Sequence, residues 1–586
     1  MVRQLVIPII FILVALSSCN KDEDLVAQGA PRIELDSETG IYTVKTGRTV
    51  TVSPTYKNVD SAIFTWTVDG KLYSTSPVLE FSSEELGEYF ATIRVDTEFG
   101  SAKEEIKIEV VDRTPPIVSF MLPQQGLKVK QNTDYVLTPD IQHSDLPDFS
   151  IEWEIDGKVV STETSYTFNG KELGEQKIKI TASNEDGATT YDLTINVIDK
   201  DPYVVSYLLP YYAAEENIRY TYPGYSVYLR PHLEYFNNPQ FSWNVDGEVI
   251  EGENNQTFAF TPTQPGEYNV TVSVTEGEIQ SKAITRNISK EATIVSTTVK
   301  VVCVSGSPKD KLRPYDSSKS KDCNKVYDFS PAPGQFINET MGTNGYTGNE
   351  TTMVAACNFA EHQLAADKYV SLGAWGGYII VGFDHSITPK TSGYDFAIQG
   401  NAFGTSNEPG IVWVMQDTNG NGLPDDEWYE LRGSETGKST TIQDYEVTYF
   451  RPAPNAQRNP WIDCFGKEGS VDRNIYHGQA FYYPIWKPDT YIVRGTLLPG
   501  TMHANGHAPY QWGYVDNCGS DNFAGDSYDG SGQMNGLKIS NAMYPDGKPV
   551  KLDYIDFIKV QCGVMEYHSS FGEVSTEVFS IEDTIN

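Results

Sequence analysis

The chain has 586 residues and a formal net charge of −35 at pH 7. This acidity argues against nucleic-acid binding, because phosphate contacts need clustered lysine and arginine, and it favours attraction of cations such as calcium. After the first 18 residues, no apolar stretch approaches the ~20 residues that cross a bilayer. The many Tyr, Thr, Val, Gly and Pro residues favour strands and turns over helices, so we expect an all-β protein.

Residues 1–18 have the features of a secretory signal peptide, with one arginine, a short apolar run and small residues before a cleavage point. The tetrapeptide Leu16-Ser17-Ser18-Cys19 resembles a bacterial lipobox, which implies that Cys19 is lipidated. Residues 20–24 resemble the acidic signal that sends some Gram-negative lipoproteins to the outer face of the outer membrane. We therefore expect residues 19–29 to be a tether; an ordinary secreted protein is the alternative.

A tryptophan followed by Asp-Gly at a fixed distance occurs three times in the first half, at Trp66, Trp153 and Trp243. The tryptophans are 87 and 90 residues apart, which is the length of one small domain. A Gly-Glu pair follows each of them and leads into a strand with period-two alternation. This pattern predicts a buried tryptophan on a central strand and a tight Asp-Gly hairpin turn in each domain.

These motifs resemble PKD-type immunoglobulin-like domains, whose usual role as spacers or adhesion modules is then implied here. The expected domains span residues 30–113, 114–200 and 201–292, with the third matching best.

Residues 293–586 do not continue the repeat and predict a larger β-sandwich or jelly-roll domain, with many strands separated by Gly, Asn and Asp turns. Six cysteines fall in the last half, and an exported chain permits disulfides in any of fifteen pairings. Free buried cysteines are the alternative. These residues are Cys303, Cys323, Cys357, Cys464, Cys518 and Cys562.

A calcium-binding loop is predicted at residues 417–427, where oxygen-bearing side chains alternate before a glycine. The spacing follows the first half of an EF-hand loop but has Trp428 at the twelfth position, so it is more similar to dockerin-like or thrombospondin-type loops. An ion-free hairpin is the alternative. The candidate ligands are Asp417, Asn419, Asn421, the carbonyl of Leu423, Asp425, Asp426 and Glu427.

Aromatic residues gather between residues 476 and 514 and are either core residues or a platform for a sugar or another flat ligand. The candidates for ligand contact are Tyr482, Tyr483, Trp486, Tyr510 and Trp512. The acidic segment 516–529 reads as a solvated loop, with an irregular second cation loop as the alternative.

Three phrases, at residues 408–414, 426–431 and 550–561, resemble Gram-negative cell-surface lipoproteins that accompany outer-membrane vitamin B12 uptake. The resemblance implies nutrient capture, of a corrinoid or a glycan, and a TonB-dependent uptake receptor as partner. Motifs for a serine nucleophile, a phosphate-binding loop or a dinucleotide are missing, so we expect no catalysis and no organic cofactor. The alternatives are a polysaccharide hydrolase using carboxylates such as Glu408 and Asp426, and an adhesin for host or mucin surfaces.

Overall fold

The structure is a computed structural model that describes residues 29–120, 122, 126–199, 203–236, 238–277, 293–340, 345–404, 406–500, 502–503, 506–523, 534–568 and 572–585. The signal peptide, Cys19 and most of the tether lie outside the described residues. The chain divides into two compact units, of which the first is built on residues up to 116 and the second on most of the remainder.

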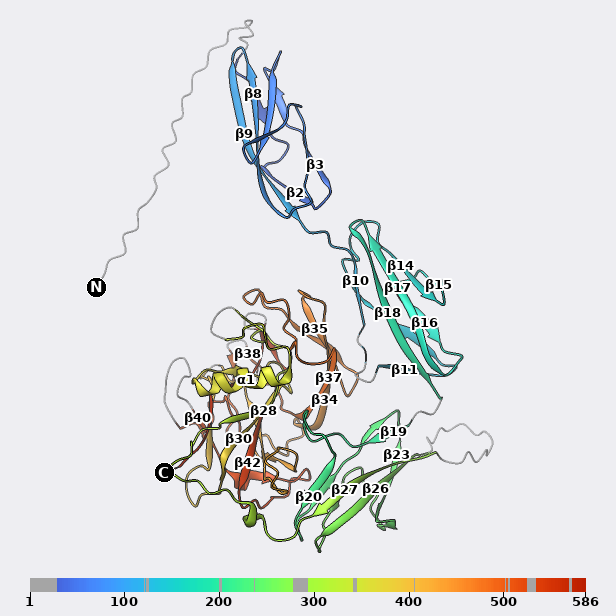
Figure 1. The fold of residues 1–586 in the computed structure, drawn as a ribbon, viewed down its shortest axis with the longest axis vertical. Coiled ribbons are helices and arrows are strands. Elements are labelled where there is room, and N and C mark those ends of the chain that lie inside the picture. Colours follow the sequence, from blue (N-terminus) through green and yellow to red (C-terminus); the bar gives the residue numbers. More distant parts are fainter. Residues whose placement is uncertain are drawn as a thin grey trace, which may run out of the picture. The chain divides into compact units, whose positions relative to one another are not determined.

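Module 1 (residues 29–116) is a β-sandwich of the immunoglobulin type (Figure 1). Its strands are β1 (Arg32–Glu34), β2 (Ile41–Lys45), β3 (Thr49–Val52), β4 (Thr55–Lys57), β5 (Ile63–Val68), β6 (Lys71–Ser74), β7 (Leu79–Ser82), β8 (Gly87–Thr97) and β9 (Gly100–Val111). The larger sheet has the order β2-β9-β8-β5-β6, with β2 parallel to β9. The pairs β1-β4 and β3-β7 complete the module.

Module 2 (residues 117–199) repeats this topology in the order β11-β18-β17-β14-β15, with the pairs β10-β13 and β12-β16. Its strands are β10 (Ile117–Ser119), β11 (Leu127–Lys130), β12 (Asp134–Leu137), β13 (Asp140–Gln142), β14 (Ser150–Ile155), β15 (Lys158–Ser161), β16 (Tyr166–Asn169), β17 (Gly174–Asn184) and β18 (Gly187–Ile198). The parallel partners at the sheet edge are again the second and the last strand of the module.

Module 3 has the same topology, β20-β27-β26-β23-β24, with the pairs β19-β22 and β21-β25. Its strands are β19 (Val204–Ser206), β20 (Ile218–Thr221), β21 (Val227–Leu229), β22 (His232–Glu234), β23 (Pro239–Val245), β24 (Glu248–Val249), β25 (Phe258–Phe260), β26 (Gly266–Glu276) and β27 (Ile294–Cys303). The predicted boundary at residue 292 is wrong, because β27 pairs with both β26 and β20 and belongs to this sheet. Module 3 therefore extends to residue 303.

The repeated tryptophans fill the cores of the three modules, as predicted. Trp66, Trp153 and Trp243 are fully buried on β5, β14 and β23, the equivalent strands of the three sheets. The Asp-Gly turns also take the predicted form: in module 2, Asp156 and Gly157 have φ values of 49° and 75°. A two-residue hairpin with both φ values positive matches the twist of the strands that it joins.

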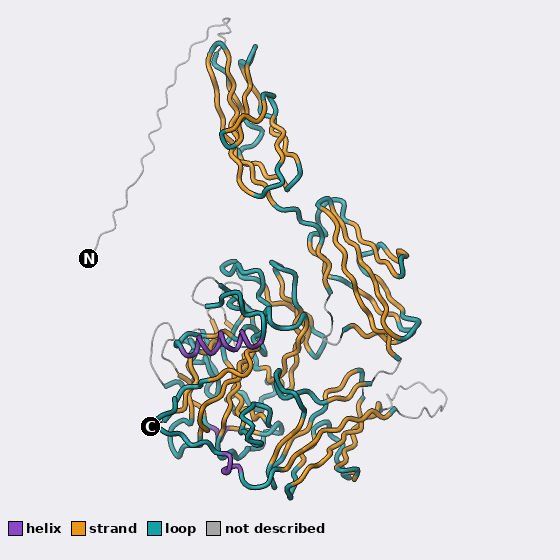
Figure 2. Tube along the Cα trace, in the orientation of Figure 1, coloured by secondary structure: helices purple, strands orange, loops and turns teal. Residues whose placement is uncertain are grey.

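The C-terminal domain (residues 304–585) is built on a six-stranded antiparallel sheet with the order β28-β30-β42-β32-β33-β41. A four-stranded sheet (β36-β35-β34-β37) and a three-stranded sheet (β40-β31-β46) accompany it. Figure 2 colours strands orange and helices purple. The strands of these sheets are β28 (Lys325–Ser330), β30 (Tyr378–Ile387), β31 (Phe396–Gln399), β32 (Gly410–Met415), β33 (Trp428–Leu431), β34 (Ile442–Phe450), β35 (Arg458–Asp463), β36 (Glu468–Asp472), β37 (Thr490–Leu497), β40 (Met534–Leu537), β41 (Ala542–Met543), β42 (Ile555–Cys562) and β46 (Ser580–Asp583).

Short elements complete the domain: the pairs β29 (Val370–Ser371) with β45 (Glu577–Val578), β38 (Met502–His503) with β39 (Gly506–His507), and β43 (Tyr567–His568) with β44 (Gly572–Glu573), and the 3₁₀ turns η1 (Pro308–Lys311) and η2 (Ile539–Asn541).

An α-helix, α1 (Met353–Ala365), packs against the six-stranded sheet and belongs to the same hydrophobic core. Thr352 caps the helix, its side chain accepting a hydrogen bond from the amide of Ala355. In the described part of the chain, no helix is both long enough and apolar enough to cross a membrane. The all-β class is confirmed, with this helix as an addition.

The cysteines of the described chain are free, so none of the fifteen predicted disulfide pairings is formed. They lie on separate elements: Cys303 ends β27, Cys357 is in α1, Cys562 ends β42, and Cys323, Cys464 and Cys518 lie in loops. The alternative of free cysteines therefore describes the structure.

Candidate functional site

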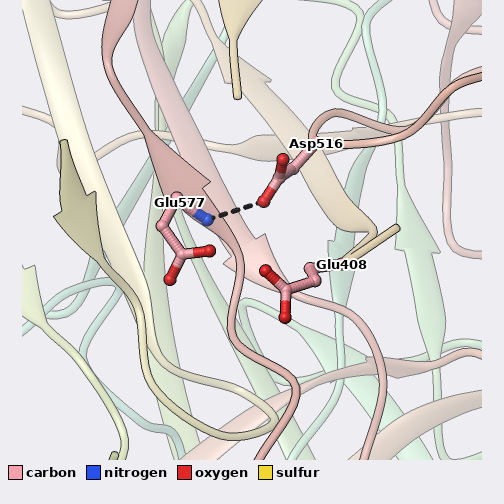
Figure 3. Close-up of side chains that lie close together, drawn as sticks. All are labelled: Glu408, Asp516 and Glu577. Carbon is pink, nitrogen blue, oxygen red and sulfur yellow. Dashed lines mark hydrogen bonds between the residues drawn. The ribbon is translucent and has the colours of Figure 1, made fainter. Parts of the chain in front are cut away.

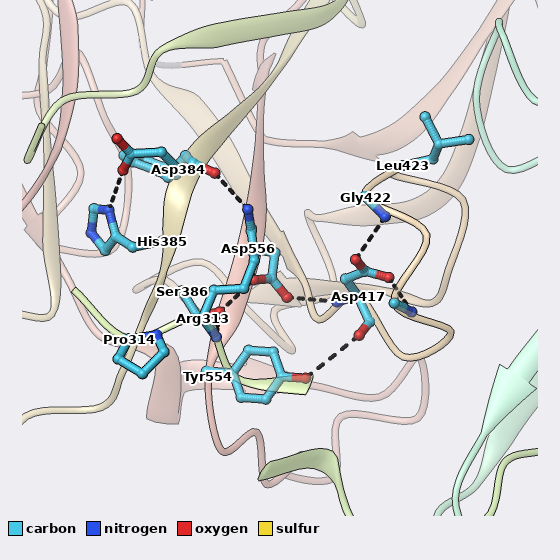
Figure 4. Close-up of polar contacts among 12 residues, drawn as sticks. Arg313, Pro314, Asp384, His385, Ser386, Asp417, Gly422, Leu423, Tyr554 and Asp556 are labelled. Carbon is cyan, nitrogen blue, oxygen red and sulfur yellow. Dashed lines mark hydrogen bonds and ion pairs between the residues drawn. The ribbon is translucent and has the colours of Figure 1, made fainter. Parts of the chain in front are cut away.

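The predicted calcium-binding loop joins β32 to β33, two neighbouring strands of the six-stranded sheet. Its first residue, Asp417, donates its backbone N–H to Oδ2 of Asp556 over 2.8 Å. Asp556 is buried, and its Oδ1 accepts hydrogen bonds from Arg313 Nη2 at 2.9 Å and Ser386 Oγ at 2.6 Å (Figure 4). The first residue of the loop is thus hydrogen-bonded to Asp556, a buried carboxylate that Arg313 and Ser386 hold in place.

The carboxylate of Asp417 organises the first half of the loop. It accepts the N–H of Gly420 at 2.7 Å and the N–H of Gly422 at 2.9 Å (Figure 4). Both glycines have φ values of 75°, a conformation that a side chain would strain. Each carboxylate oxygen retains a lone pair, so this arrangement leaves capacity to bind a cation.

The two asparagines bring the second half of the loop back to the first. Asn419 Nδ2 lies 3.2 Å from Asp425 Oδ1, and Asn421 Nδ2 lies 2.9 Å from Asp425 Oδ2. Their Oδ1 atoms accept the backbone N–H groups of Asn421 and Leu423 at 2.8 Å each. Three of the predicted ligand side chains therefore lie in one hydrogen-bonded group.

Asp426 has an unsatisfied oxygen inside the loop. Its Oδ2 accepts the N–H of Thr418 at 2.6 Å, whereas its buried Oδ1 has no hydrogen-bond partner. Burial raises the pKa of Asp426 well above its usual range, and the nearby charge of Asp417 adds to this effect. A buried carboxylate oxygen without a donor is costly unless a proton or a cation satisfies it.

The oxygen donors of the loop fit a calcium ion, which prefers six to eight oxygen ligands in a flexible loop. The fitting side chains are Asp417, Asn419, Asn421, Asp425 and Asp426. Glu427 does not belong to this set, because its Oε1 lies 3.4 Å from Nε of Arg219 in module 3. The prediction for Glu427 is therefore corrected: it is the partner of a guanidinium.

The predicted aromatic platform is wrong for four of its five residues, because they are core residues. Tyr482, Tyr483, Trp486 and Tyr510 are at most 6 % exposed, and only Trp512, at 37 %, reaches solvent substantially. Tyr482 and Tyr483 pack in the core above the four-stranded sheet, and Trp486 packs with the core that contains α1. Their hydroxyl and indole groups bond to backbone carbonyls, which fixes them in the interior.

A different set of aromatic side chains lines a pocket of about 930 Å³ between module 3 and the C-terminal domain. Its aromatic lining comes from Tyr211, Tyr212 and Tyr220 of module 3 and Tyr327 of β28. Asn421, Leu423 and Asp425, from the loop between β32 and β33, form part of the same lining. The loop therefore contributes one wall of the pocket.

The exposed tyrosine of this pocket is held in place by neighbours. Tyr212 is 51 % exposed, and its ring lies 4.5 Å from Nζ of Lys487. Its N–H donates to Oδ2 of Asp328 over 3.3 Å. Tyr211 beside it is buried; desolvation, with the charge of Asp425 adding, raises its pKa to about 12. The polar rim is completed by the amides of Asn324 and Asn358, the carboxylates of Glu215, Glu216 and Glu361, and the ammonium group of Lys325.

Sequence reasoning missed this pocket because its tyrosines lie on two domains. The adjacent pair Tyr211-Tyr212 follows Pro210 between β19 and β20 and was a usable local signal. Glu408 and Asp426, the carboxylates suggested for a hydrolase, are not brought together either: Glu408 lies beside Asp516 and Glu577, and Asp426 is held in its own loop.

Comparison with known proteins supports the description of the modules. Residues 30–97 and 115–184, in the first two of the expected domains, match the PKD-like domain family, whereas the third, which was expected to match best, lies outside the matched ranges. Domains of this family are common in extracellular and surface proteins and are typically non-catalytic. No curated protein sequence matches the chain.

Several solved structures with tandem domains are also similar to parts of the chain. The I-band fragment I67–I69 of titin is 14 % identical and covers 47 % of this chain and 99 % of its own, with a TM-score of 0.19. The three N-terminal domains of the bacteriophage RB49 outer capsid protein Hoc are 15 % identical and cover 47 % of this chain and 97 % of their own, with a TM-score of 0.23. Fibronectin(III)-like modules of Clostridium thermocellum CbhA are 17 % identical and cover 29 % and 95 %, with a TM-score of 0.17.

Proposed function

We propose that this chain is a lipid-anchored surface protein whose C-terminal domain binds a glycan without turning it over, with the immunoglobulin-like modules as its stalk. The observation that carries the proposal is the pocket between module 3 and the C-terminal domain, with four tyrosines in its lining and amides and carboxylates around them. Its volume of about 930 Å³ falls within the range of small-molecule sites. Tyrosine faces stack on sugar rings, while amides and carboxylates accept and donate hydrogen bonds to hydroxyl groups.

The charge of the pocket favours a glycan over a corrinoid. The lining has four carboxylates, Glu215, Glu216, Glu361 and Asp425, and one cation, Lys325. A neutral polyhydroxylated ligand suits this rim, whereas the phosphate of a cobalamin would be repelled by it. Cobalamin is therefore the comparison ligand in the binding experiment below.

Replacing Tyr212 by alanine should weaken glycan binding at least tenfold, because the variant loses the one pocket ring that is half exposed. The measurement is calorimetry of the full chain against a panel of soluble glycans and cobalamin. Tyr476→Ala is the matched control, since this tyrosine is 75 % exposed in the same domain and does not line the pocket.

Three results would contradict the proposal. Cobalamin binding that Tyr212→Ala abolishes would assign the pocket to a corrinoid, and equal affinities of the two tyrosine variants would remove the pocket as the site. Shortening of a glycan during incubation would make the protein a hydrolase.

Calcium has a structural role in this proposal. An ion held by Asp417, Asn419, Asn421, Asp425 and Asp426 would stiffen the wall of the pocket that this loop forms. The uptake partner would be a TonB-dependent receptor that takes the captured ligand from the surface.

The outer-membrane location rests on Cys19 and the residues that flank it. We expect cells that express the full chain to incorporate labelled palmitate into it and to lose the chain to externally added protease. Cys19→Ala should abolish both the label and the membrane association, because the lipid is the anchor of an otherwise water-soluble body. A labelled chain that resists protease on intact cells would place it on the inner face.

A further inference from the structure

Three carboxylates from distant parts of the sequence meet in the C-terminal domain. Glu408 lies just before β32, and Glu577 is the first residue of β45. Asp516 lies between β39 and β40. One carboxylate oxygen from each lies within 4.8 Å of the other two (Figure 3). Asp516 is 1 % exposed, so the prediction of a solvated loop is wrong at this residue.

Hydrogen bonds that involve backbone groups hold the three residues in this arrangement. Oδ1 of Asp516 accepts the N–H of Asn401 at 2.7 Å, and Oδ2 accepts the N–H of Glu577 at 2.9 Å (Figure 3). The N–H of Glu408 donates to the carbonyl of Asp516 over 2.9 Å. Gly400 lies so close that a Cβ there would collide with Asp516. The cluster is therefore a fixed part of the fold.

One oxygen of the buried Glu577 carboxylate has no hydrogen-bond partner. Oε1 accepts the hydroxyl of Ser575 at 2.6 Å, but Oε2 is buried without a hydrogen-bond donor. The side chain is 1 % exposed, and Figure 3 shows its carboxylate directed toward Glu408. Within the described ranges of the chain, no Lys, Arg or His forms an ion pair with Glu408, Asp516 or Glu577.

Buried carboxylates without a counter-charge are strongly unfavourable, so the cluster requires a proton or a cation. We propose that Glu408, Asp516 and Glu577 bind a divalent cation, with calcium as the best match in size. Calcium–oxygen distances of about 2.3–2.6 Å place opposite ligands roughly 4.6–5.2 Å apart, whereas magnesium needs a more compact set. Glu408 is partly exposed and is the least buried of the three residues.

This cation would cross-link three chain segments that are already joined by hydrogen bonds. Thr576 Oγ1 donates to the carbonyl of Glu408 over 2.8 Å, so the segments already touch on either side of the carboxylates. The alternative is a shared proton, because burial and mutual repulsion raise the pKa of Glu408 and of Asp516. A proton and a cation are distinguished by direct binding measurements.

The test is equilibrium dialysis of the chelator-treated full chain against radioactive calcium at neutral pH. We expect two bound ions per wild-type chain, one at residues 417–426 and one at this cluster. Glu577→Gln should weaken one of the two sites at least tenfold, and Asp417→Asn should weaken the other. Glu573→Gln is the matched control, because Glu573 is 4 % exposed, four residues earlier in the chain and outside the cluster.

Glu408→Gln provides a second test, since Glu408 is partly exposed and its substitution disturbs the interior least. It should weaken the same site as Glu577→Gln and leave the circular dichroism spectrum unchanged. Identical calcium binding by wild type, Glu408→Gln and Glu577→Gln would overturn the inference and favour the shared proton. Loss of an ion in Glu577→Gln but not in Asp417→Asn would instead support this cluster and remove the loop site.

Discussion

Replacing Trp153 by alanine is expected to destabilise module 2 by about 3–5 kcal/mol, the range for deleting a large buried aromatic side chain. The indole is fully buried, and its ring centre lies 5.6 Å from Tyr166 and 6.1 Å from Phe120. Its Nε1 also donates to the carbonyl of Glu163 over 2.8 Å. A domain of this length is stabilised by only roughly 4–13 kcal/mol in total, so the loss removes much of the stability of the module.

Calorimetry of the full chain should therefore show one transition moved to a much lower temperature in Trp153→Ala, with new tryptic cleavage confined to module 2. Trp512→Ala is the matched control, because Trp512 is 37 % exposed and a change at the surface costs far less. A variant Trp153→Ala that melts like the control would show that the tryptophan does not fill the core of the module.

The immunoglobulin-like modules could be predicted because their signals are local. A tryptophan on an alternating strand and an Asp-Gly pair three residues later specify a buried side chain and a hairpin within a single stretch of chain. The end of module 3 could not be predicted in the same way. β27 reads as an ordinary strand, and its assignment depends on parallel pairing with β20, about 80 residues away.

The aromatic residues of the C-terminal domain show the same limit. Tyr482, Tyr483 and Trp486 have the composition of a ligand platform, but composition does not say which face of the chain meets the core. Tyr212 and Tyr327 are separated by more than 100 residues and line one pocket only after module 3 and the C-terminal domain have folded against each other. A site that is assembled from distant segments can be recognised only once the fold is known.

The carboxylates show the same difference between residues of one loop, whose grouping could be predicted, and residues of distant segments, whose grouping could not. Asp417, Asn419, Asn421 and Asp425 were predicted as one group because a single loop brings them together, and their hydrogen bonds agree with that grouping. Glu427 was also predicted in this group, but it forms an ion pair with Arg219, a residue of module 3. Glu408, Asp516 and Glu577 come from three segments, and nothing in the spacing of their sequence indicated that they meet.

Removing calcium from the full chain is expected to lower the melting temperature of the C-terminal domain by about 5 °C or more. A ligand at a hundred times its Kd adds about 2.7 kcal/mol to the stability of the folded state, and each kcal/mol shifts the melting temperature of a domain of this size by roughly 2–4 °C. The physical reason is the buried Oδ1 of Asp426, which has no donor and would be satisfied by the ion. Differential scanning calorimetry with and without chelator measures the shift, and added calcium should restore the original value.

Asp417→Asn should reduce this calcium-dependent shift by about half or more, because the variant removes one negative charge from a buried loop while preserving its shape. Asp489→Asn is the control, since that side chain is 90 % exposed and lies outside the loop. The shift that remains in Asp417→Asn should disappear when Glu577→Gln is added, because the two ions would then both be lost. An equal shift in Asp417→Asn and Asp489→Asn would exclude the loop as a calcium site, and an equal response to magnesium would argue against a site of calcium size.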